Sequence, residues 1–317
     1  VATPGALYSF EDIMGESRAL RRTVELARKA SSGDMTTLIT GESGTGKELF
    51  AQAIHNSSSV CKGPFVAVSC AAIPRDLIES ELFGYVGGAF TGARKGGMIG
   101  KMELAKGGTL FLDGVEALPL TAQIGIVRLL RGGETARVGG GQGRTVSVRL
   151  IAGAGPGLSE AVREGLFLKE LHELLREYTI TVPPLRERRS DIEALAARCA
   201  SRFAQALGKQ PKPIAPEAME ALLRYSWPGN VRELETVLER AVALAEGDVI
   251  GLSDLHARIS AAEVSVPTGK PLPGHEAKRL LAALERTAGN VREAAKLLGI
   301  SRGGFYVKLK KLGLNPD

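Results

Sequence analysis

The stretch Gly41-Glu42-Ser43-Gly44-Thr45-Gly46-Lys47-Glu48 decides the fold. It follows a short apolar run at residues 37–40, which we expect to be a buried strand, and precedes apolar residues at helical spacing over residues 49–54. A strand, a glycine-rich loop ending in Gly-Lys and a helix together predict a P-loop. The glycines let the backbone wrap closely around phosphates, the helix adds the positive end of its dipole, and Lys47 supplies a mobile charge. A P-loop usually ends in Ser or Thr, whose hydroxyl holds Mg²⁺, whereas this one ends in Glu48.

Length and charge indicate an enzyme-like body with a basic end. The 317 residues are enough for two or three packed units, and 44% of them are hydrophobic. No apolar run approaches the ~18 residues of a membrane span, and no signal-peptide pattern opens the chain. We therefore expect a cytoplasmic protein, with an upstream part missing before Val1. Residues 275–317 carry nine basic against four acidic side chains, within a total net charge of +6, which indicates a nucleic-acid-binding module.

The order of periodic segments predicts an α/β fold followed by helical units. Strand and helix patterns alternate up to Pro183-Pro184, which is typical of a parallel sheet covered on both faces. The apolar strand at residues 108–113 ends in Asp113, an acid that in P-loop proteins lies beside the phosphates and holds Mg²⁺. Only helical patterns follow, then a Pro- and Gly-rich linker, then three helical patterns with a turn at Gly299. We expect a nucleotide-binding αβ subdomain over residues 1–183, a helical lid over 184–259, a linker over 260–274 and a helix-turn-helix domain over 275–317.

A glycine-rich segment at residues 84–100 surrounds Gly88-Ala89-Phe90-Thr91-Gly92-Ala93. Such a flexible loop with one exposed aromatic is either unstructured filler or a moving surface that contacts another molecule. Its composition alone does not choose between these two interpretations.

The chain resembles the NtrC-type AAA+ activators, also called bacterial enhancer-binding proteins, which remodel RNA polymerase carrying the alternative sigma factor of the RpoN type. The resemblance covers nearly the whole chain, and the Glu48 form of the P-loop is the form that this family uses. Besides the P-loop and the segment at residues 88–93, it rests on Glu79-Ser80-Glu81-Leu82-Phe83-Gly84, Gly107-Gly108-Thr109-Leu110-Phe111-Leu112-Asp113, Arg137-Val138-Gly139-Gly140, Pro183-Pro184-Leu185-Arg186-Glu187-Arg188, Trp227-Pro228-Gly229-Asn230-Val231-Arg232-Glu233-Leu234 and a Fis-like helix-turn-helix that contains Ala294-Ala295-Lys296-Leu297-Leu298-Gly299-Ile300-Ser301.

The resemblance implies a P-loop AAA+ αβ subdomain, a helical lid and ring-shaped homo-oligomers, typically hexamers, with ATP or ADP at the subunit interfaces. It implies that Asp113 binds Mg²⁺ through water. The nucleotide would be held by Ile13, Gly15, Glu42, Ser43, Gly44, Thr45, Gly46, Lys47, Glu48, Asp113 and Arg232. The sigma factor would be contacted by Gly88, Ala89, Phe90, Thr91, Gly92 and Ala93.

The C-terminal helix-turn-helix is expected to place its second helix in the major groove of double-stranded DNA. Dimerisation through these tails is expected, because such modules bind paired half-sites. Two glycines in this helix each cost about 1 kcal/mol and remove side chains where the family carries polar readers, so we expect weaker or altered specificity. The expected DNA-contacting residues are Arg302, Gly303, Gly304, Tyr306, Lys308, Lys310 and Lys311.

The departures from the family all concern ATP hydrolysis, so no catalytic residue is assigned. Where the family has a Glu that polarises the attacking water, this chain has Gly114, and we expect Glu116 to point in a different direction and not to substitute. The family's two asparagines near that Glu correspond to Ser69 and Gly155. Its two arginines that could reach a neighbour's γ-phosphate are replaced by Leu168 and Leu174.

Magnitudes indicate what these losses mean. A water-positioning side chain contributes on the order of a hundredfold and an arginine finger roughly a thousandfold to hydrolysis. We therefore expect a DNA-binding regulator that binds ATP or ADP, contacts the sigma factor with RNA polymerase and hydrolyses ATP weakly or not at all. The alternative is a competent AAA+ ATPase activator, alone or in mixed rings with an active paralogue, that remodels the closed complex of the polymerase.

Overall fold

A computed structural model of the chain describes residues 5–141, 143–255, 259 and 287. The chain divides into two compact units, residues 1–263 and 264–317. Within the described residues, no helix has the length and apolar character that crossing a membrane requires. The predicted linker and helix-turn-helix lie outside the described residues, apart from Thr287, and so do the DNA-contacting positions Arg302, Gly303, Gly304, Tyr306, Lys308, Lys310 and Lys311.

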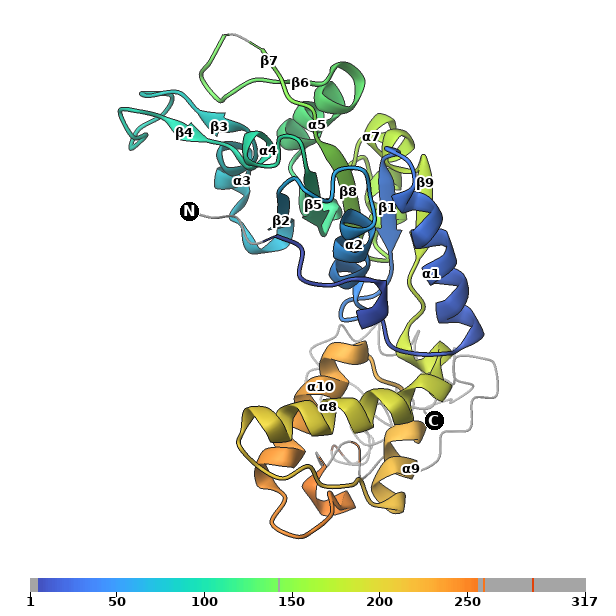
Figure 1. Cartoon of the computed structure of the whole chain (residues 1–317). Coiled ribbons are helices and arrows are strands. Elements are labelled where there is room, and N and C mark those ends of the chain that lie inside the picture. The colour runs from blue at the N-terminus through green and yellow to red at the C-terminus, as the bar shows by residue number, and fades with distance from the viewer. Residues whose placement is uncertain (1–4, 142, 256–258, 260–286, 288–317) are drawn as a thin grey trace. The chain divides into compact units, whose positions relative to one another are not determined.

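A five-stranded parallel sheet forms the centre of the first unit (Figure 1). Its strand order is β2-β5-β8-β1-β9, and every neighbouring pair is parallel. The register aligns Asp113 with Ser69 on one side and with Gly153 on the other, so the carboxyl ends of the strands meet at one edge. The predicted α/β class is therefore confirmed. The strands are β1 Thr37–Thr40, β2 Phe65–Ser69, β5 Thr109–Asp113, β8 Arg149–Ala154 and β9 Tyr178–Thr181.

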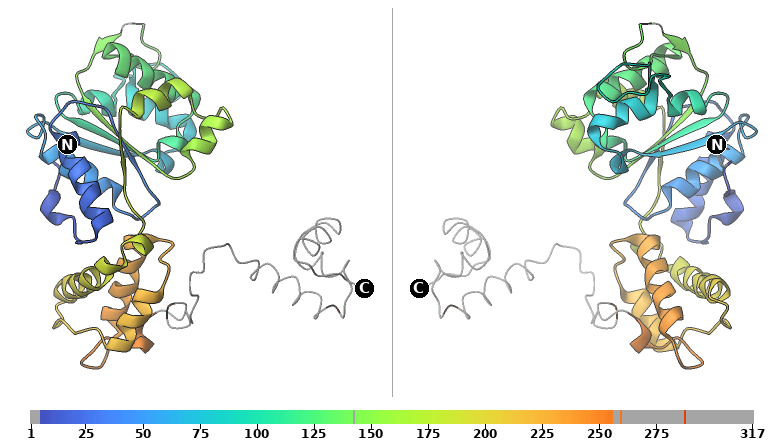
Figure 2. Two further views of the ribbon diagram at one scale, coloured as in Figure 1. Left: turned by 90° about the vertical axis from the view of Figure 1, so that its right-hand side faces the viewer. Right: turned by 90° about the vertical axis from the view of Figure 1, so that its left-hand side faces the viewer.

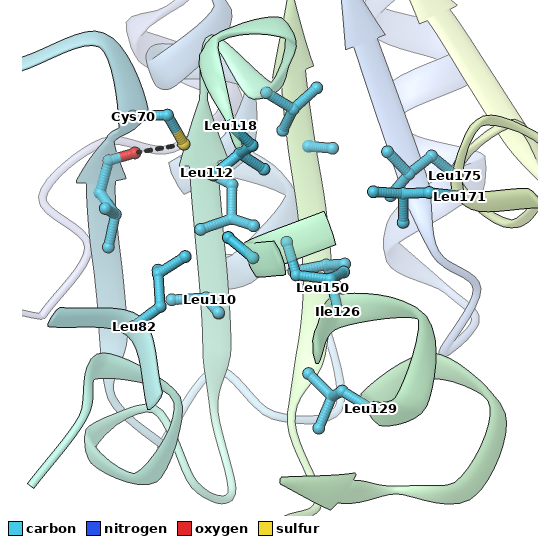
Figure 3. Close-up of a cluster of buried hydrophobic side chains, with 14 of the residues drawn as sticks. Cys70, Leu82, Leu110, Leu112, Leu118, Ile126, Leu129, Leu150, Leu171 and Leu175 are labelled. Atoms are coloured by element: carbon cyan, nitrogen blue, oxygen red, sulfur yellow. Dashed lines mark hydrogen bonds between the residues drawn. The ribbon is translucent and has the colours of Figure 1, made fainter. Parts of the chain in front are cut away.

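Helices cover both faces of this sheet, as Figure 2 shows from two sides. Alternation along β5 sends Leu110 and Leu112 to one face and Phe111 to the other, and each face has its own buried cluster. The cluster that contains Leu110 and Leu112 is drawn in Figure 3. One face packs against α1 Arg18–Ser31 and α2 Lys47–Asn56, and the other against α3 Arg75–Phe83, α5 Leu120–Gly132, α6 Leu158–Arg163 and α7 Lys169–Leu175.

Shorter elements connect these layers and shape the loops around the site. The glycine-rich segment of the sequence forms a hairpin, with its loop between two short strands, β3 and β4. A second hairpin, β6 and β7, follows α5. These elements are η1 Phe10–Asp12, η2 Cys70–Ala72, β3 Gly84–Tyr85, β4 Met98–Ile99, α4 Lys101–Leu104, η3 Val115–Ala117, β6 Glu134–Thr135 and β7 Arg144–Thr145.

A helical lid with its own core follows β9. Its buried centre is Trp227, whose indole Nε1 donates to the carbonyl of Leu222 at 2.8 Å and whose ring meets the ring of Tyr225 edge-on at 5.0 Å. The helical patterns predicted after Pro183-Pro184 are present as helices, and Pro216 begins one of them, where its missing N–H costs nothing. The elements are η4 Leu185–Glu187, η5 Arg189–Asp191, α8 Ile192–Ala206, α9 Pro216–Arg224, α10 Asn230–Leu244 and η6 Leu252–Asp254.

Candidate functional site

The P-loop connects β1 to α2 and touches the lid. Gly44 has φ of +75°, and a Cβ at this position would lie 2.2 Å from the carbonyl oxygen of Gly229, so only glycine permits the approach. The carbonyl of Gly44 accepts hydrogen bonds from the N–H groups of Val231 and Arg232, at 3.0 and 3.4 Å, in the first turn of α10. The loop that the sequence predicts to bind phosphates thus also binds the lid through its main chain.

Lys47, the first residue of α2, is half-buried beside this loop. Its ammonium Nζ donates to the carbonyls of Gly41 and Glu42, at 2.9 and 3.1 Å. Burial lowers the pKa of Lys47, while the nearby carboxylates of Asp113 and Glu116 raise it. The cation is therefore held at the mouth of the loop with two acids close by, as binding of a metal-complexed polyphosphate requires.

A cavity of about 290 Å³ opens beside the loop. Apolar side chains from the segment just after η1, from α2 and from the lid form one part of its wall, and four guanidinium groups form another. An apolar slot next to cationic groups and phosphate-binding amides suits a purine nucleotide. The wall comprises Tyr8, Asp12, Ile13, Met14, Gly44, Thr45, Gly46, Leu49, Phe50, Arg188, Leu195, Arg198, Cys199, Arg202, Val231, Arg232 and Glu235.

Five of the predicted nucleotide residues, Ile13, Gly44, Thr45, Gly46 and Arg232, line this cavity. The others lie around it in different roles. Gly15 lies just before Glu16 and Ser17 in the chain. The main-chain N–H groups of Glu16 and Ser17 each donate to the buried Asp191 carboxylate at 2.8 Å. Glu48 lies in the first turn of α2, where its carboxylate accepts from Gln52 at 3.2 Å.

Glu42 joins the P-loop to the lid. The guanidinium of Arg186 donates to both carboxylate oxygens of Glu42, at 2.6 and 2.7 Å, and the amide of Asn230 donates to one of them at 3.1 Å. Arg186 and then Asn230 lower the pKa of Glu42 to about 2. The next residue, Ser43, accepts from Arg232 Nη1 at 3.2 Å.

Asn230 connects the P-loop to the lid by hydrogen bonds, a role that the sequence did not predict. It is fully buried in a left-handed conformation, with φ of +54°. Its Oδ1 accepts from the N–H of Leu185 at 2.8 Å, and its Nδ2 donates to the Ser43 carbonyl at 3.0 Å as well as to Glu42. The only signal in the sequence is its place after Pro228-Gly229, because Asn is among the few residues that tolerate this conformation.

The acidic edge of the site lies at the carboxyl ends of β2, β5 and β8. Asp113 ends β5 between Ser69 and Gly153 of its neighbours. Glu116 lies at the same edge, because its Oε1 accepts from the N–H of Gly155 at 2.9 Å, at the end of β8. Its charge also acts on Lys47.

The two leucines at the expected arginine positions face inward. Leu168 and Leu174 are partly buried and pack against the hydrophobic cluster that includes Leu171 and Leu175 of α7. The main-chain N–H of Leu168 donates to Gln123 Oε1 at 2.8 Å, which fixes the backbone there. These side chains contribute to the core of the αβ subdomain and carry no charge.

The segment at residues 88–93 is the loop of the β3–β4 hairpin, which is a two-stranded sheet of its own. Phe90 is 42% exposed, and its ring meets the ring of Tyr85 at 5.0 Å. The hairpin base is held by reciprocal bonds with Val138, which accepts from Val86 at 3.1 Å and donates to Gly84 at 2.9 Å. An aromatic side chain is thus presented to solvent on a supported loop, which favours the interpretation as a contact surface.

Three family models match consecutive parts of the chain. The sigma-54 interaction domain matches residues 13–181, the AAA+ ATPase lid domain matches residues 186–272, and the bacterial regulatory protein, Fis family, matches residues 272–312. The chain belongs to the sigma-54 interaction domain family. The predicted AAA+ family, with its lid and C-terminal helix-turn-helix domain, is thereby confirmed.

Relatives of this sigma-54 interaction domain protein include transcriptional regulators. It is 41% identical over 313 residues to a signal-transduction and transcriptional-control protein of Clostridium beijerinckii, across 98% of this chain and 50% of that one. It is 43% identical over 314 residues to the transcriptional regulatory protein ZraR of Klebsiella oxytoca, across 98% and 70%. The chain therefore spans from half to about seven-tenths of the length of these relatives.

The fold is also similar to solved structures. NtrX from Brucella abortus in complex with ATP matches with a TM-score of 0.74 and 34% identity, over 96% of this chain and 70% of that one. The same protein in complex with ADP matches with a TM-score of 0.74 and 33% identity, over the same shares. Both agree with an αβ subdomain followed by a helical lid.

Proposed function

We propose that this protein is a DNA-binding transcriptional regulator that acts on RNA polymerase carrying sigma-54 and binds ATP or ADP at its P-loop. The observation that carries the proposal is that one domain mounts both a glycine-loop cavity and a supported, exposed Phe90 loop. The match to the sigma-54 interaction domain and the regulatory role named for ZraR support it.

The nucleotide would lie with its base in the apolar part of the cavity and its phosphates at the loop. Ile13 and Val231 would flank the base, and Arg232 would approach the phosphates from the wall of the cavity. Lys47, held at the carbonyls of Gly41 and Glu42, would approach them from the loop. The complexes of NtrX with ATP and with ADP support this choice of ligand.

The donor set suits Mg²⁺ held jointly with a nucleotide. Among the described residues, no group of three or more His, Cys, Asp or Glu side chains could hold a metal by itself. A single carboxylate, Asp113, beside the phosphate-binding Lys47 fits the way that Mg²⁺ is shared between one or two acids, water and phosphates. Bound there through water, Mg²⁺ would neutralise phosphate charge.

We further propose that ATP hydrolysis is slow. Gly114 carries no side chain to position water, and Leu168 and Leu174 pack into the core where the family has arginines. Losing an arginine finger alone costs roughly a thousandfold in phosphoryl transfer. The cradle that binds the nucleotide does not depend on these positions.

The proposal is tested by measuring nucleotide affinity and steady-state turnover on the same preparation with Mg-ATP. We expect binding of ATP and ADP with turnover far below that of active AAA+ activators. Lys47→Met should abolish binding, whereas Lys106→Met, an exposed lysine away from the loop, should not. Turnover at rates typical of the family would refute slow hydrolysis, and failure to bind nucleotide would refute the site.

A second candidate function is a competent ATPase activator, alone or in mixed rings with an active paralogue. The specific observation that favours it is the intact Phe90 loop, which is of little use unless hydrolysis somewhere drives it. Mixing this chain with an active homologue distinguishes the two. A gain in transcription from a sigma-54 promoter above that of the homologue alone favours mixed rings.

We propose that the chain works as a homo-oligomer, dimeric through its C-terminal domain and able to form a hexameric ring. We also propose that Arg302, Tyr306 and the lysines at 308, 310 and 311 contact DNA, with little discrimination because of Gly303 and Gly304. Titration of operator and unrelated duplexes at several salt concentrations tests this. Arg302→Ala should weaken binding and reduce the salt dependence by about one phosphate contact, whereas strong operator discrimination by the unaltered chain would contradict the proposal.

A further inference from the structure

Gly114 and Gly155, two of the positions at which this chain departs from the family's hydrolytic site, are linked through a backbone turn and Glu116. Gly114 follows Asp113 in a left-handed conformation, with φ of +73° and ψ of +49°. Its N–H donates to the Gly153 carbonyl on β8 at 2.8 Å, and its own carbonyl accepts from the N–H of Ala117 at 3.0 Å. The turn therefore folds the η3 segment back along the end of the sheet, which carries Glu116 toward β8.

The end of β8 receives the Glu116 side chain because residue 155 is glycine. Oε1 of Glu116 accepts from the N–H of Gly155 at 2.9 Å. A Cβ on residue 155 would lie only 2.7 Å from that oxygen. A side chain at position 155 and the carboxylate of Glu116 would thus compete for the same space, so the glycines at 114 and 155 act together with Glu116 as one arrangement.

The second carboxylate oxygen of Glu116, Oε2, has no hydrogen-bond donor among the described residues. This oxygen is buried. A buried carboxylate oxygen without a donor is costly, and native sites with such an atom commonly hold a water, ion or substrate. The Glu116 carboxylate is therefore oriented by the backbone through one oxygen and available to a donor through the other.

The carboxylates of Asp113 and Glu116 both act on the charge of Lys47. Both raise the pKa of Lys47. Burial raises the pKa of the Cys70 thiol at the end of β2 to about 12, and the same two carboxylates contribute to that shift. Figure 3 shows Cys70 and Leu118, the latter just after the turn, both beside Leu112 near the end of β5. The hydrogen bond to Gly155 and the turn at Gly114 thus place Glu116 at the ends of β5 and β8, where its charge also acts on Lys47.

We propose that Glu116 positions the attacking water for the slow ATP hydrolysis of this chain, from a location that the turn at Gly114 creates. This inference rests on the proposed nucleotide site. Oε2 would accept a hydrogen bond from the water. As the bond from the water oxygen to the γ-phosphorus forms, the bond from that phosphorus to the β–γ bridging oxygen breaks, and the water proton passes to the released phosphate and then to solvent.

A purely structural role would give Glu116 only the task of satisfying the N–H of Gly155. Glu116→Gln separates the two roles, because the amide carbonyl can still accept from Gly155, whereas a neutral amide positions water poorly. The matched control is Glu164→Gln, an exposed glutamate at the end of α6. Both variants should keep the thermal transition and the ATP affinity of the unaltered chain.

The experiment uses the full chain in excess over radiolabelled Mg-ATP, so that very slow cleavage is measured in a single turnover. Intact ATP recovered from the protein after a fixed time is a second readout. We expect Glu116→Gln to slow cleavage by at least about tenfold and to retain intact ATP, since water-positioning groups contribute about 10² to 10⁴. Glu164→Gln should match the unaltered chain.

The outcomes separate this inference from the proposed function. Cleavage by Glu116→Gln at the unaltered rate would overturn the inference, and so would an unaltered chain that binds ATP but never cleaves it. The second result would leave the proposed regulator standing. Rapid turnover that Glu116→Gln abolishes would instead support Glu116 and overturn slow hydrolysis. Failure of all three proteins to bind ATP would overturn both.

Discussion

Replacing Asn230 by alanine should destabilise the lid more than any other single exchange of an asparagine in the described part of the chain. The change removes the acceptor of the buried Leu185 N–H and the donor to the Ser43 carbonyl. A buried group left without its partner costs about 1–3 kcal/mol. Alanine must also adopt φ of +54°, which costs a further ~1 kcal/mol. We expect a total loss of about 2–4 kcal/mol.

Two companion variants divide this loss into its parts. Asn230→Gly removes the same hydrogen bonds but tolerates the left-handed backbone, so it should be about 1 kcal/mol more stable than Asn230→Ala. Asn56→Ala is the matched control at the end of α2, because its amide donates to the carbonyls of Ala6 and Tyr8 at 3.2 and 2.7 Å but is only partly buried. It should cost about 1 kcal/mol.

The assay is urea unfolding followed by tryptophan fluorescence, because Trp227 is the single tryptophan and lies at the centre of the lid core. The midpoint should fall in the order unaltered chain, Asn230→Gly, Asn230→Ala, with the slope unchanged. A loss below about 0.5 kcal/mol in Asn230→Ala would refute the hydrogen-bond reasoning. Equal stability of the glycine and alanine variants would refute the backbone-strain reasoning.

Three further predictions concern the ion pair between Glu42 and Arg186, the exposed Phe90 loop and the ion pair at the base of the β3–β4 hairpin. The pKa of Glu42 is about 2 in the folded chain against 4.5 for the free side chain, so its pairing with Arg186 contributes stability above about pH 4.5 that disappears as the pH falls through 2. The difference in urea midpoint between the unaltered chain and Glu42→Gln should therefore shrink over this pH window. A difference that stays constant would contradict the prediction. Phe90→Ala should abolish binding of sigma-54, measured by fluorescence anisotropy with a non-hydrolysable ATP analogue, while nucleotide affinity stays intact. The control is Leu244→Ala, which changes an exposed leucine of the lid. Equal binding of sigma-54 by the two variants would contradict a contact through the Phe90 loop. Arg137→Met removes a bidentate ion pair, at 2.7 and 2.9 Å, with a glutamate of α4 at the base of the hairpin. Trypsin should therefore cleave at the basic residues of the loop several-fold faster. An unchanged rate of cleavage would show that this ion pair does not hold the hairpin.

Local patterns in the sequence were sufficient for the elements and the phosphate loop. The run before Gly41 and the helical spacing after Lys47 are set by neighbours in the chain, and both β1 and α2 lie where they are predicted. The class of fold follows from the alternation of such elements. These features depend on backbone geometry and burial that a few consecutive residues determine.

What the sequence could not supply depends on partners far away or on one dihedral angle. Glu42 is in the phosphate loop, yet its carboxylate binds Arg186 and Asn230, which come 144 and 188 residues later. The direction of Glu116 depends on the left-handed turn at Gly114 and on the space left at Gly155. A glycine permits such a turn without requiring it, so spacing alone could not give the direction of this acid.

The shared hydrogen bonds at Gly44 have a thermodynamic consequence. Its carbonyl is bound by the first turn of α10, so the conformation of the phosphate loop and the seating of the lid are one variable. We expect a load that shifts the lid to change the affinity of the proposed nucleotide site, and by reciprocity a bound nucleotide would change the free energy of that load by the same amount. A partner that never touches the nucleotide could therefore set its exchange simply by pulling on α10.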